Sequence, residues 1–183
     1  TNSSALFRFP KPRILVTWSA NDRYQIRARV EREVGQLDFA DFVATANLAT
    51  GVVSAGNAKL EPERRWVFET AFERRFWDSG DVVLTLRHVA LQQVIDQVPV
   101  EGFNAPGNIG NGRRETAIVD LTLPLAPLGM RGGLLKARGQ ATLSRVIDPT
   151  TGRPRMVSDD EPFSGSVTLT NDIPQLKSTW TVS

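Results

Sequence analysis

The sequence alternates between apolar and polar residues over stretches that no helix would produce. In residues 24–34 the apolar set is Tyr24, Ile26, Ala28, Val30 and Val34, and Arg32 is its one exception. The positions between them carry charged or amide side chains. A period of two places the two sets on opposite faces of a β-strand. This segment is therefore predicted to be a strand with one apolar and one aqueous face.

The same pattern recurs along nearly the whole chain. It is present in residues 66–76 and in the segments RILVTWS, VVLTLRHV, ETAIVDLTLPL, LLKARGQATL, FSGSVTLTN and KSTWTVS. About eight strands are predicted in all, which makes the fold all-β. The one segment that could form a short helix, FADFVATANLA at 39–49, falls between two of these strands.

The connections between these strands alternate in length. Short turns are predicted at AND, DSGD, APLGMRGG and DIPQL, and long connections at 36–65, 96–114 and 147–162. The short ones are rich in the residues that turn geometry favours. An antiparallel up-and-down sheet with this order has all its turns at one end and all its loops at the other. Outer-membrane β-barrels have that asymmetry.

Composition narrows the classes of protein. The chain has 183 residues, of which 40% are hydrophobic and 23% charged, as expected of one ordinary domain. Its net charge of +2 comes from 22 basic and 20 acidic residues, a balance that does not indicate a nucleic-acid partner. There is no cysteine, and no apolar run approaches the roughly 20 residues of a membrane-spanning helix. Contact with a membrane would therefore have to be made by strands.

Alternation alone leaves two interpretations open. In a soluble β-barrel or β-sandwich that binds a ligand, the apolar set would face a closed core, whereas in a membrane barrel it would face lipid. Trp18, Phe76 and Trp77 lie beside predicted short turns, where a membrane barrel carries an aromatic girdle. The membrane interpretation predicts an outer, lipid-facing set of Trp66, Phe68, Phe72, Val119, Leu121 and Val167.

One motif points to a family. The segment GNAKLEPE at 56–63 resembles the GNPxLxPE signature of TonB-dependent outer-membrane receptors, with Ala58 in place of the usual proline. The matching positions are Gly56, Asn57, Leu60, Pro62 and Glu63. The flanking RVEREVGQLDFADFVA, FERRFWDSGDVVLTLRH and APGNIGNGRRE also resemble receptors of this family from Gram-negative bacteria, so the likeness covers nearly the whole chain.

The resemblance implies a location and a function. It implies an antiparallel, up-and-down transmembrane β-barrel segment of about eight strands, over residues 1–183, in a bacterial outer membrane. The implied function is import of a scarce nutrient such as a metal chelate, vitamin or saccharide, energised by TonB. The implied partners are membrane lipid, lipopolysaccharide, a plug domain, TonB and the nutrient. The charged row is expected to face the barrel lumen: Arg27, Arg29, Glu31, Glu33, Glu69 and Glu73.

The chain also departs from the family's pattern. A complete receptor resembles a barrel of about 22 strands filled by an N-terminal plug. This sequence shows neither a plug nor a TonB box, and no aromatic residue at its end. It is therefore expected to be a segment of a larger barrel.

Catalytic and metal-binding patterns find little support in the sequence, and no enzyme activity or cofactor is predicted. The lone histidine, His88, is interpreted as a strand residue near the barrel surface or a loop end rather than as a catalytic base. The DDEP run at 159–162 could bind calcium, but a solvated loop is favoured. The GNIGNG run at 107–112 is interpreted as a flexible loop. Arginines predicted in outer loops could contact lipopolysaccharide phosphates or another anion, although ordinary solvation is favoured: Arg113, Arg114, Arg153 and Arg155.

Overall fold

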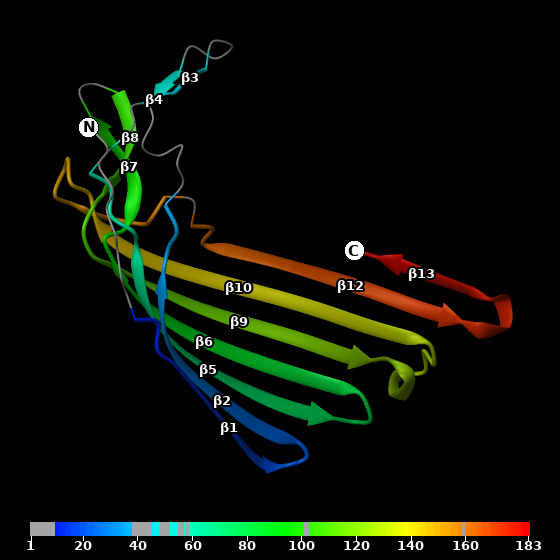
Figure 1. Ribbon diagram of the computed structural model, residues 1–183. Helices are drawn as coiled ribbons and strands as arrows, with labels where there is room; N and C mark the ends of the chain where they lie inside the picture. The colour runs from blue at the N-terminus through cyan, green and yellow to red at the C-terminus, as the bar shows by residue number, and fades with distance from the viewer. Residues whose placement is uncertain are drawn as a thin grey trace.

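The chain folds into strands in a computed structural model that describes residues 10–37, 45–47, 52–54, 57, 59–100, 103–158 and 160–183 (Figure 1). Its helices within these ranges are two short 3-10 turns, η2 (Ala126–Leu128) and η3 (Pro174–Leu176). None of the described helices is long and apolar enough to cross a membrane. The strands are β1 (Arg13–Asn21), β2 (Tyr24–Val34), β3 (Thr45–Asn47), β4 (Val52–Ser54), β5 (Arg64–Phe76), β6 (Gly80–Gln92), β7 (Ile95–Val100), β8 (Phe103–Asn108), β9 (Gly112–Pro124), β10 (Gly133–Ile147), β11 (Pro154–Arg155), β12 (Phe163–Ile173) and β13 (Ser178–Val182).

Eight strands form one antiparallel meander. Their order is β1-β2-β5-β6-β9-β10-β12-β13, and the two-residue β11 adds to β10. Every pair in this path is antiparallel. Each strand pairs with the next strand of the path along the chain, and only the short strands β3, β4, β7, β8 and β11 of the long connections come between them in sequence. The predicted all-β, up-and-down, antiparallel architecture is confirmed. Within the described residues the sheet stays open, with β1 and β13 as its edges.

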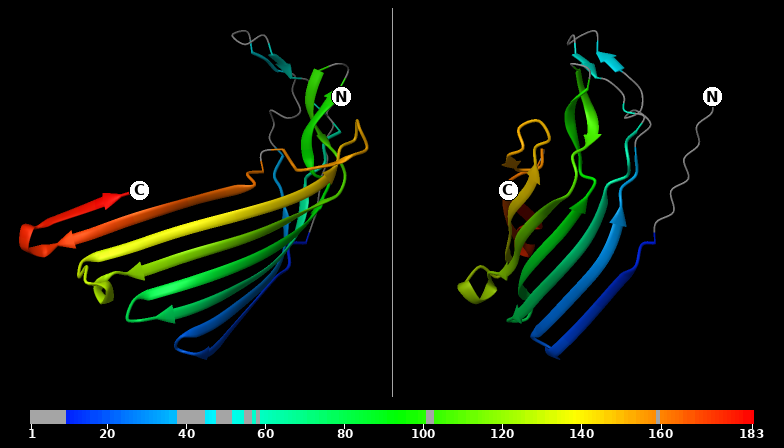
Figure 2. Two further views of the ribbon diagram at one scale, coloured as in Figure 1. Left: turned by 180° about the vertical axis from the view of Figure 1, so that it is seen from behind. Right: turned by 90° about the vertical axis from the view of Figure 1, so that its left-hand side faces the viewer.

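Turns and loops lie at opposite ends of the meander. The short β1–β2, β5–β6, β9–β10 and β12–β13 connections all lie at one end, and the long ones lie at the other (Figures 1 and 2). Local chemistry fixes the short turns: the Asn21 side chain accepts hydrogen bonds from the backbone N–H groups of Arg23 and Tyr24. Gly129, with φ of 97°, ends η2 in a left-handed conformation that glycine adopts without strain. We refer below to the turn end and the loop end.

The long connections contain a second sheet that the sequence did not predict. Its order is β3-β4-β8-β7, and it stands beyond the loop end of the meander (Figure 1). Ser54 of β4 pairs in parallel with Asn104 of β8, so the expectation of antiparallel pairing throughout is wrong at this one bridge. Where described, the possible helix at 39–49 is strand β3. The GNIGNG run belongs to the end of β8 and the start of β9, with only Ile109, Gly110 and Asn111 between the two strands, and is not one flexible loop.

The register divides the meander into two faces. The apolar face carries Ile26, Phe68, Phe72, Leu86 and Val119 and their cross-strand neighbours. Many of its side chains are exposed: Phe68 is 44% accessible and Leu86 54%. The predicted outer set all lies on this face, and it is not packed into a closed interior: Trp66, Phe68, Phe72, Val119, Leu121 and Val167.

The opposite face, which we call the polar face, is the crowded one. The sheet is curved (Figure 2), and a curved sheet brings together the side chains on its inner side. Small residues such as Ala71, Thr116 and Thr142 are buried there. The only apolar cluster among the described residues lies at the loop end, beneath the loops, and consists of Val67, Val89, Leu91, Val94, Ile109 and Val146. The core therefore anchors the loops to the meander.

Candidate functional site

The motif at 56–63 runs into β5 at the loop end. Gly56 and Ala58 lie outside the described residues, whereas Asn57, Leu60, Pro62 and Glu63 lie within them. The Asn57 side chain donates to the Pro106 carbonyl at 3.0 Å, and its oxygen accepts from the Lys59 N–H. Leu60 is only 3% accessible. These contacts fasten the segment that enters β5 to the β7–β8 hairpin.

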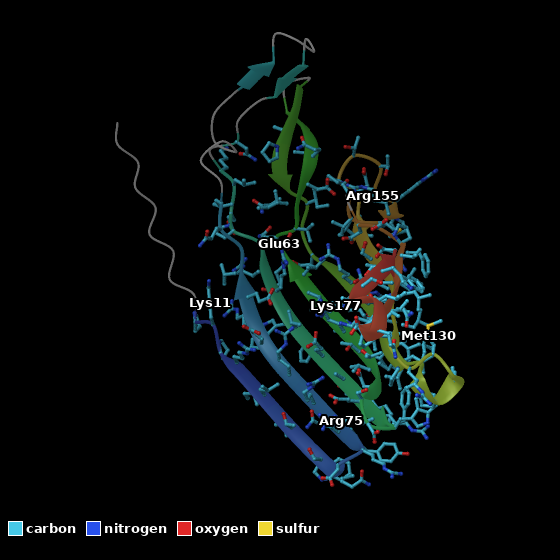
Figure 3. The ribbon with its side chains drawn as sticks, turned by 90° about the vertical axis from the view of Figure 1, so that its right-hand side faces the viewer. Lys11, Glu63, Arg75, Met130, Arg155 and Lys177 are labelled. Carbon is cyan, nitrogen blue, oxygen red and sulfur yellow. The ribbon has the colours of Figure 1, made fainter. Side chains whose placement is uncertain are left out.

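Glu63 closes this segment against the sheet. Its carboxylate accepts a hydrogen bond from Arg65 Nε at 2.6 Å and one from the Ile95 backbone N–H at 3.3 Å. Its backbone carbonyl accepts from Gly35 N–H at 2.8 Å. Figure 3 shows Glu63 at the junction of sheet and loops and Arg75 toward the turn end. One acidic residue thus joins the end of β2 to the starts of β5 and β7.

Asn108 is a second tether that sequence reasoning missed. Its side-chain oxygen accepts from the Glu61 N–H at 2.8 Å, and its amide donates to the carbonyls of Glu61 and Gln93, each at 2.9 Å. These partners are 47 and 15 residues away in the sequence. An asparagine in a glycine-rich run is typical of a turn. The local sequence therefore gave no indication that this side chain connects distant parts of the chain.

A third tether is an ion-pair cluster between β7 and the β10–β12 connection. Arg155 Nη1 donates to Asp96 at 2.9 Å and its Nε to Asp148 at 3.0 Å. Burial alone would raise the pKa of Asp96, but hydrogen bonds from Ser158, the Gln97 N–H and Arg155 outweigh it and lower that pKa below its ordinary value. The Thr151 N–H, with Arg155, likewise lowers the pKa of Asp148. Hydrogen bonding to Asp96 raises the pKa of Arg155.

The polar face carries an ion-pair network. Glu69 accepts from Arg29 at 3.2 Å and from Arg87 at 2.6 Å, which links β2, β5 and β6. Arg29 also pairs with Glu31 at 3.0 Å. A parallel set joins Glu73 to Arg27 at 3.3 Å and to Arg75 at 2.7 Å, and Glu33 lies 4.0 Å from Arg65. The structure thus brings together on this face the residues predicted to face a lumen; the lumen itself remains a prediction.

This face is suited to contact with water and polar solutes. The carboxylates of its ion-pair network each pair with an arginine. The described residues include no group of three or more His, Cys, Asp or Glu side chains that could hold a metal ion. Donors and acceptors alternate along a shallow hollow of about 300 Å³ lined by Arg27, Arg29 and Glu69, among others. Such a surface can hydrogen-bond a hydrated ligand or a second polar surface.

The remaining candidates are dispersed. His88 lies in β6 on the apolar face, 2.7 Å from Glu115, with its ring 5.9 Å from that of Phe68. Asp159 lies outside the described residues, and Asp160 pairs with Arg114 at 2.6 Å, so this part of the DDEP run is not freely solvated.

The four arginines predicted in outer loops do not form one group. Arg113 and Arg114 are consecutive residues of β9, so their side chains lie on opposite faces. Arg153 and Arg155 lie in the β10–β12 connection, where Arg155 belongs to the ion-pair cluster with Asp96 and Asp148.

The chain matches no protein-family model and no curated protein.

Proposed function

We propose that this chain forms part of the wall of a transmembrane β-barrel in a bacterial outer membrane, in a receptor of the TonB-dependent kind. The observation that carries the proposal is the apolar face. It extends across all eight strands of the meander, is exposed rather than covered, and has its charged residues only toward the strand ends. A face of that kind needs an apolar solvent.

The height of the face supports the same conclusion. On β5 the nearest charged residues of this face are Arg64 and Arg74, ten positions apart. At about 3.3 Å per residue and a tilt of about 40°, this spacing corresponds to a height of about 25 Å, which matches the apolar band of outer-membrane barrels. Trp66, Phe68 and Phe72 lie between the two arginines, with Thr70 as the one polar residue.

Arginines and aromatic rings meet at the limits of this face. Arg32 lies 5.9 Å from the ring centre of Trp66 toward the loop end, and Arg74 lies 5.8 Å from that of Tyr24 toward the turn end. Trp18, Trp77 and Trp180 are exposed at the turn end. Amphipathic rings and long cationic side chains are favoured where hydrocarbon gives way to headgroups.

The polar face would then line the lumen, and the tethered loops would stand outside the cell. Import of a scarce nutrient through that lumen, with a plug domain and TonB, follows from the resemblance at 56–63 and its flanks. The ion-pair network gives the lumen a wetted wall that a plug or a hydrated metal chelate, vitamin or saccharide could contact.

The experiment starts from the native, full-length protein in its own cells. We expect it in the outer-membrane fraction, extractable only with detergent, and we expect its deletion to slow growth when the scarce nutrient limits growth. Deleting TonB should produce the same growth defect and should add nothing to the receptor deletion. Recovery as a soluble, detergent-independent monomer would instead support the soluble ligand-binding interpretation.

A further inference from the structure

Two arginines face one another on the apolar face without an acidic partner. Arg113 of β9 is the direct register partner of Arg145 of β10, and both are exposed. Among the described residues no carboxylate forms an ion pair with either guanidinium, whereas Arg114, one residue along, pairs with Asp160. Like charges directly opposite each other destabilise a sheet. A bound anion would remove that repulsion.

The pair lies at one limit of the apolar face. Leu123 on β9 and Leu135 on β10, themselves register partners, are each ten residues from Arg113 and Arg145 respectively, toward the turn end. That spacing again corresponds to a height of about 25 Å in a tilted strand. The two guanidinium groups would therefore stand at headgroup level on the loop side of the membrane.

An apolar groove begins directly below the pair. It has a volume of about 490 Å³ and is lined mainly by apolar atoms, from residues such as Phe68, Leu86, Ala141 and Leu143, together with the hydrogen-bonded pair of His88 and Glu115. Leu143 is two residues from Arg145 on the same face, so the groove and the arginines are continuous. Glu115, the nearest acidic residue on β9, is hydrogen-bonded by His88 Nδ1 at 2.7 Å. A smaller hollow of about 300 Å³ is lined by both arginines together with neighbouring residues such as Asn111 and Ile147.

We infer that Arg113, Arg145 and the groove below them form a binding site for a phosphorylated membrane lipid, an inference that rests on the proposed function. The two guanidinium groups bind the headgroup phosphate through charge-assisted hydrogen bonds, and one acyl chain lies in the groove. The occupant is a lipid rather than free phosphate, because the cationic pair and the apolar groove adjoin at the depth where a headgroup and its chain adjoin.

The test uses the intact protein in micelles of an uncharged detergent. Three probes are added separately: a diacyl lipid with a phosphate headgroup, the matching diacylglycerol without phosphate, and inorganic phosphate. We expect the phosphorylated lipid to bind at least about ten-fold more tightly than the diacylglycerol, since two charge-assisted contacts distinguish them. Inorganic phosphate should displace it poorly, because phosphate cannot fill the groove.

Arg145→Glu is the decisive variant. It places a carboxylate opposite Arg113 and so exchanges a repulsive cross-strand pair for an attractive one, which should leave the fold intact or more stable. The preference for phosphorylated lipid should disappear. Arg153→Glu makes the same charge change in the exposed β10–β12 connection and should preserve it. Ala141→Phe fills the groove and should weaken binding of both lipids.

Two results would overturn the inference. The first is that Arg145→Glu keeps the same preference for phosphorylated lipid over diacylglycerol. The second is that inorganic phosphate displaces the bound phosphorylated lipid as effectively as unlabelled phosphorylated lipid does. Flotation of the unmodified protein with lipid vesicles measures whether the protein associates with a membrane at all, and so distinguishes failure of the lipid site from failure of the proposed function. A protein that floats but lacks the preference refutes only the lipid site, whereas one that does not associate with vesicles refutes the membrane proposal.

Discussion

Placing an arginine at Val119 distinguishes a lipid-facing from a water-facing sheet. Val119 lies six residues from Arg113 and five from Pro124, near the middle of β9. It is 44% accessible, and its register partners are Leu84 and Gly139. A Cβ added at Gly139 would meet nothing within 4 Å, so an arginine at 119 has room beside it. The substitution therefore tests the solvent rather than the packing.

The two environments predict different costs. If the face contacts lipid, Val119→Arg should lower the free energy of unfolding by about 2–4 kcal/mol, the cost of a cation at the bilayer midplane. If the face contacts water, an exposed substitution should change it by no more than about 0.5 kcal/mol. Leu121 lies two residues nearer the turn end, about 5 Å lower in a tilted strand, so Leu121→Arg should cost less than Val119→Arg.

The assay is equilibrium unfolding of the intact protein in lipid vesicles by guanidinium, followed by tryptophan fluorescence. Thr122→Arg is the matched control, since it adds the same side chain to the polar face of the same strand, opposite Asp81. It should cost much less than Val119→Arg. Equal stability of Val119→Arg and the unmodified protein would refute the assignment of this face to lipid.

Three further predictions concern the polar face and the tethers. Glu69→Gln removes the negative charge shared by Arg29 and Arg87 and replaces one carboxylate oxygen with an NH₂ donor, so it should destabilise the sheet by about 1–2 kcal/mol in the same unfolding assay, after allowance for partial exposure of the three side chains. Asn108→Ala removes three hydrogen bonds and should accelerate hydrogen exchange in β7 and β8 but leave β9 and β10 unchanged. Because folding lowers the pKa of Asp96, its contribution is complete above the ordinary value of 3.8 and is lost as the pH falls through the lower, folded value. Protease resistance of the β7–β8 hairpin should therefore persist from neutral pH to about pH 4 and fall only below it; loss near pH 6 would contradict this assignment.

The alternating strands could be predicted from sequence because their signal is local. The pattern around Phe68 and Phe72 identifies both the strand and the face, and turn residues such as Asn21 and Gly129 mark where the chain reverses. Which residue of the predicted outer set lies nearest the middle of the face follows only from the strand bounds: because β9 begins at Gly112 and ends at Pro124, it is Val119 rather than Leu121.

The loop sheet and its tethers could not be predicted. Residues 95–108 contain Pro99 and a Pro-Gly pair and lack clean alternation, so the β7–β8 hairpin has no periodic signal. Asp96 and Arg155 are 59 residues apart, and only the folded chain brings them together. The facing pair of Arg113 and Arg145 likewise depends on the register of β9 and β10, which sequence alone does not determine.

The alternation of short turns and long connections determines how freely the loop end of the molecule can change. The connections between β2 and β5, β6 and β9, and β10 and β12 contain 29, 19 and 15 residues. For a flexible connection, the entropy of closure grows only with the logarithm of length, so going from 15 to 29 residues costs about 0.6 kcal/mol. Register in the meander is fixed by the short turns and by side-chain pairing. Segments at the loop end that lie outside the tethers can therefore lengthen or change composition at little cost to the sheet.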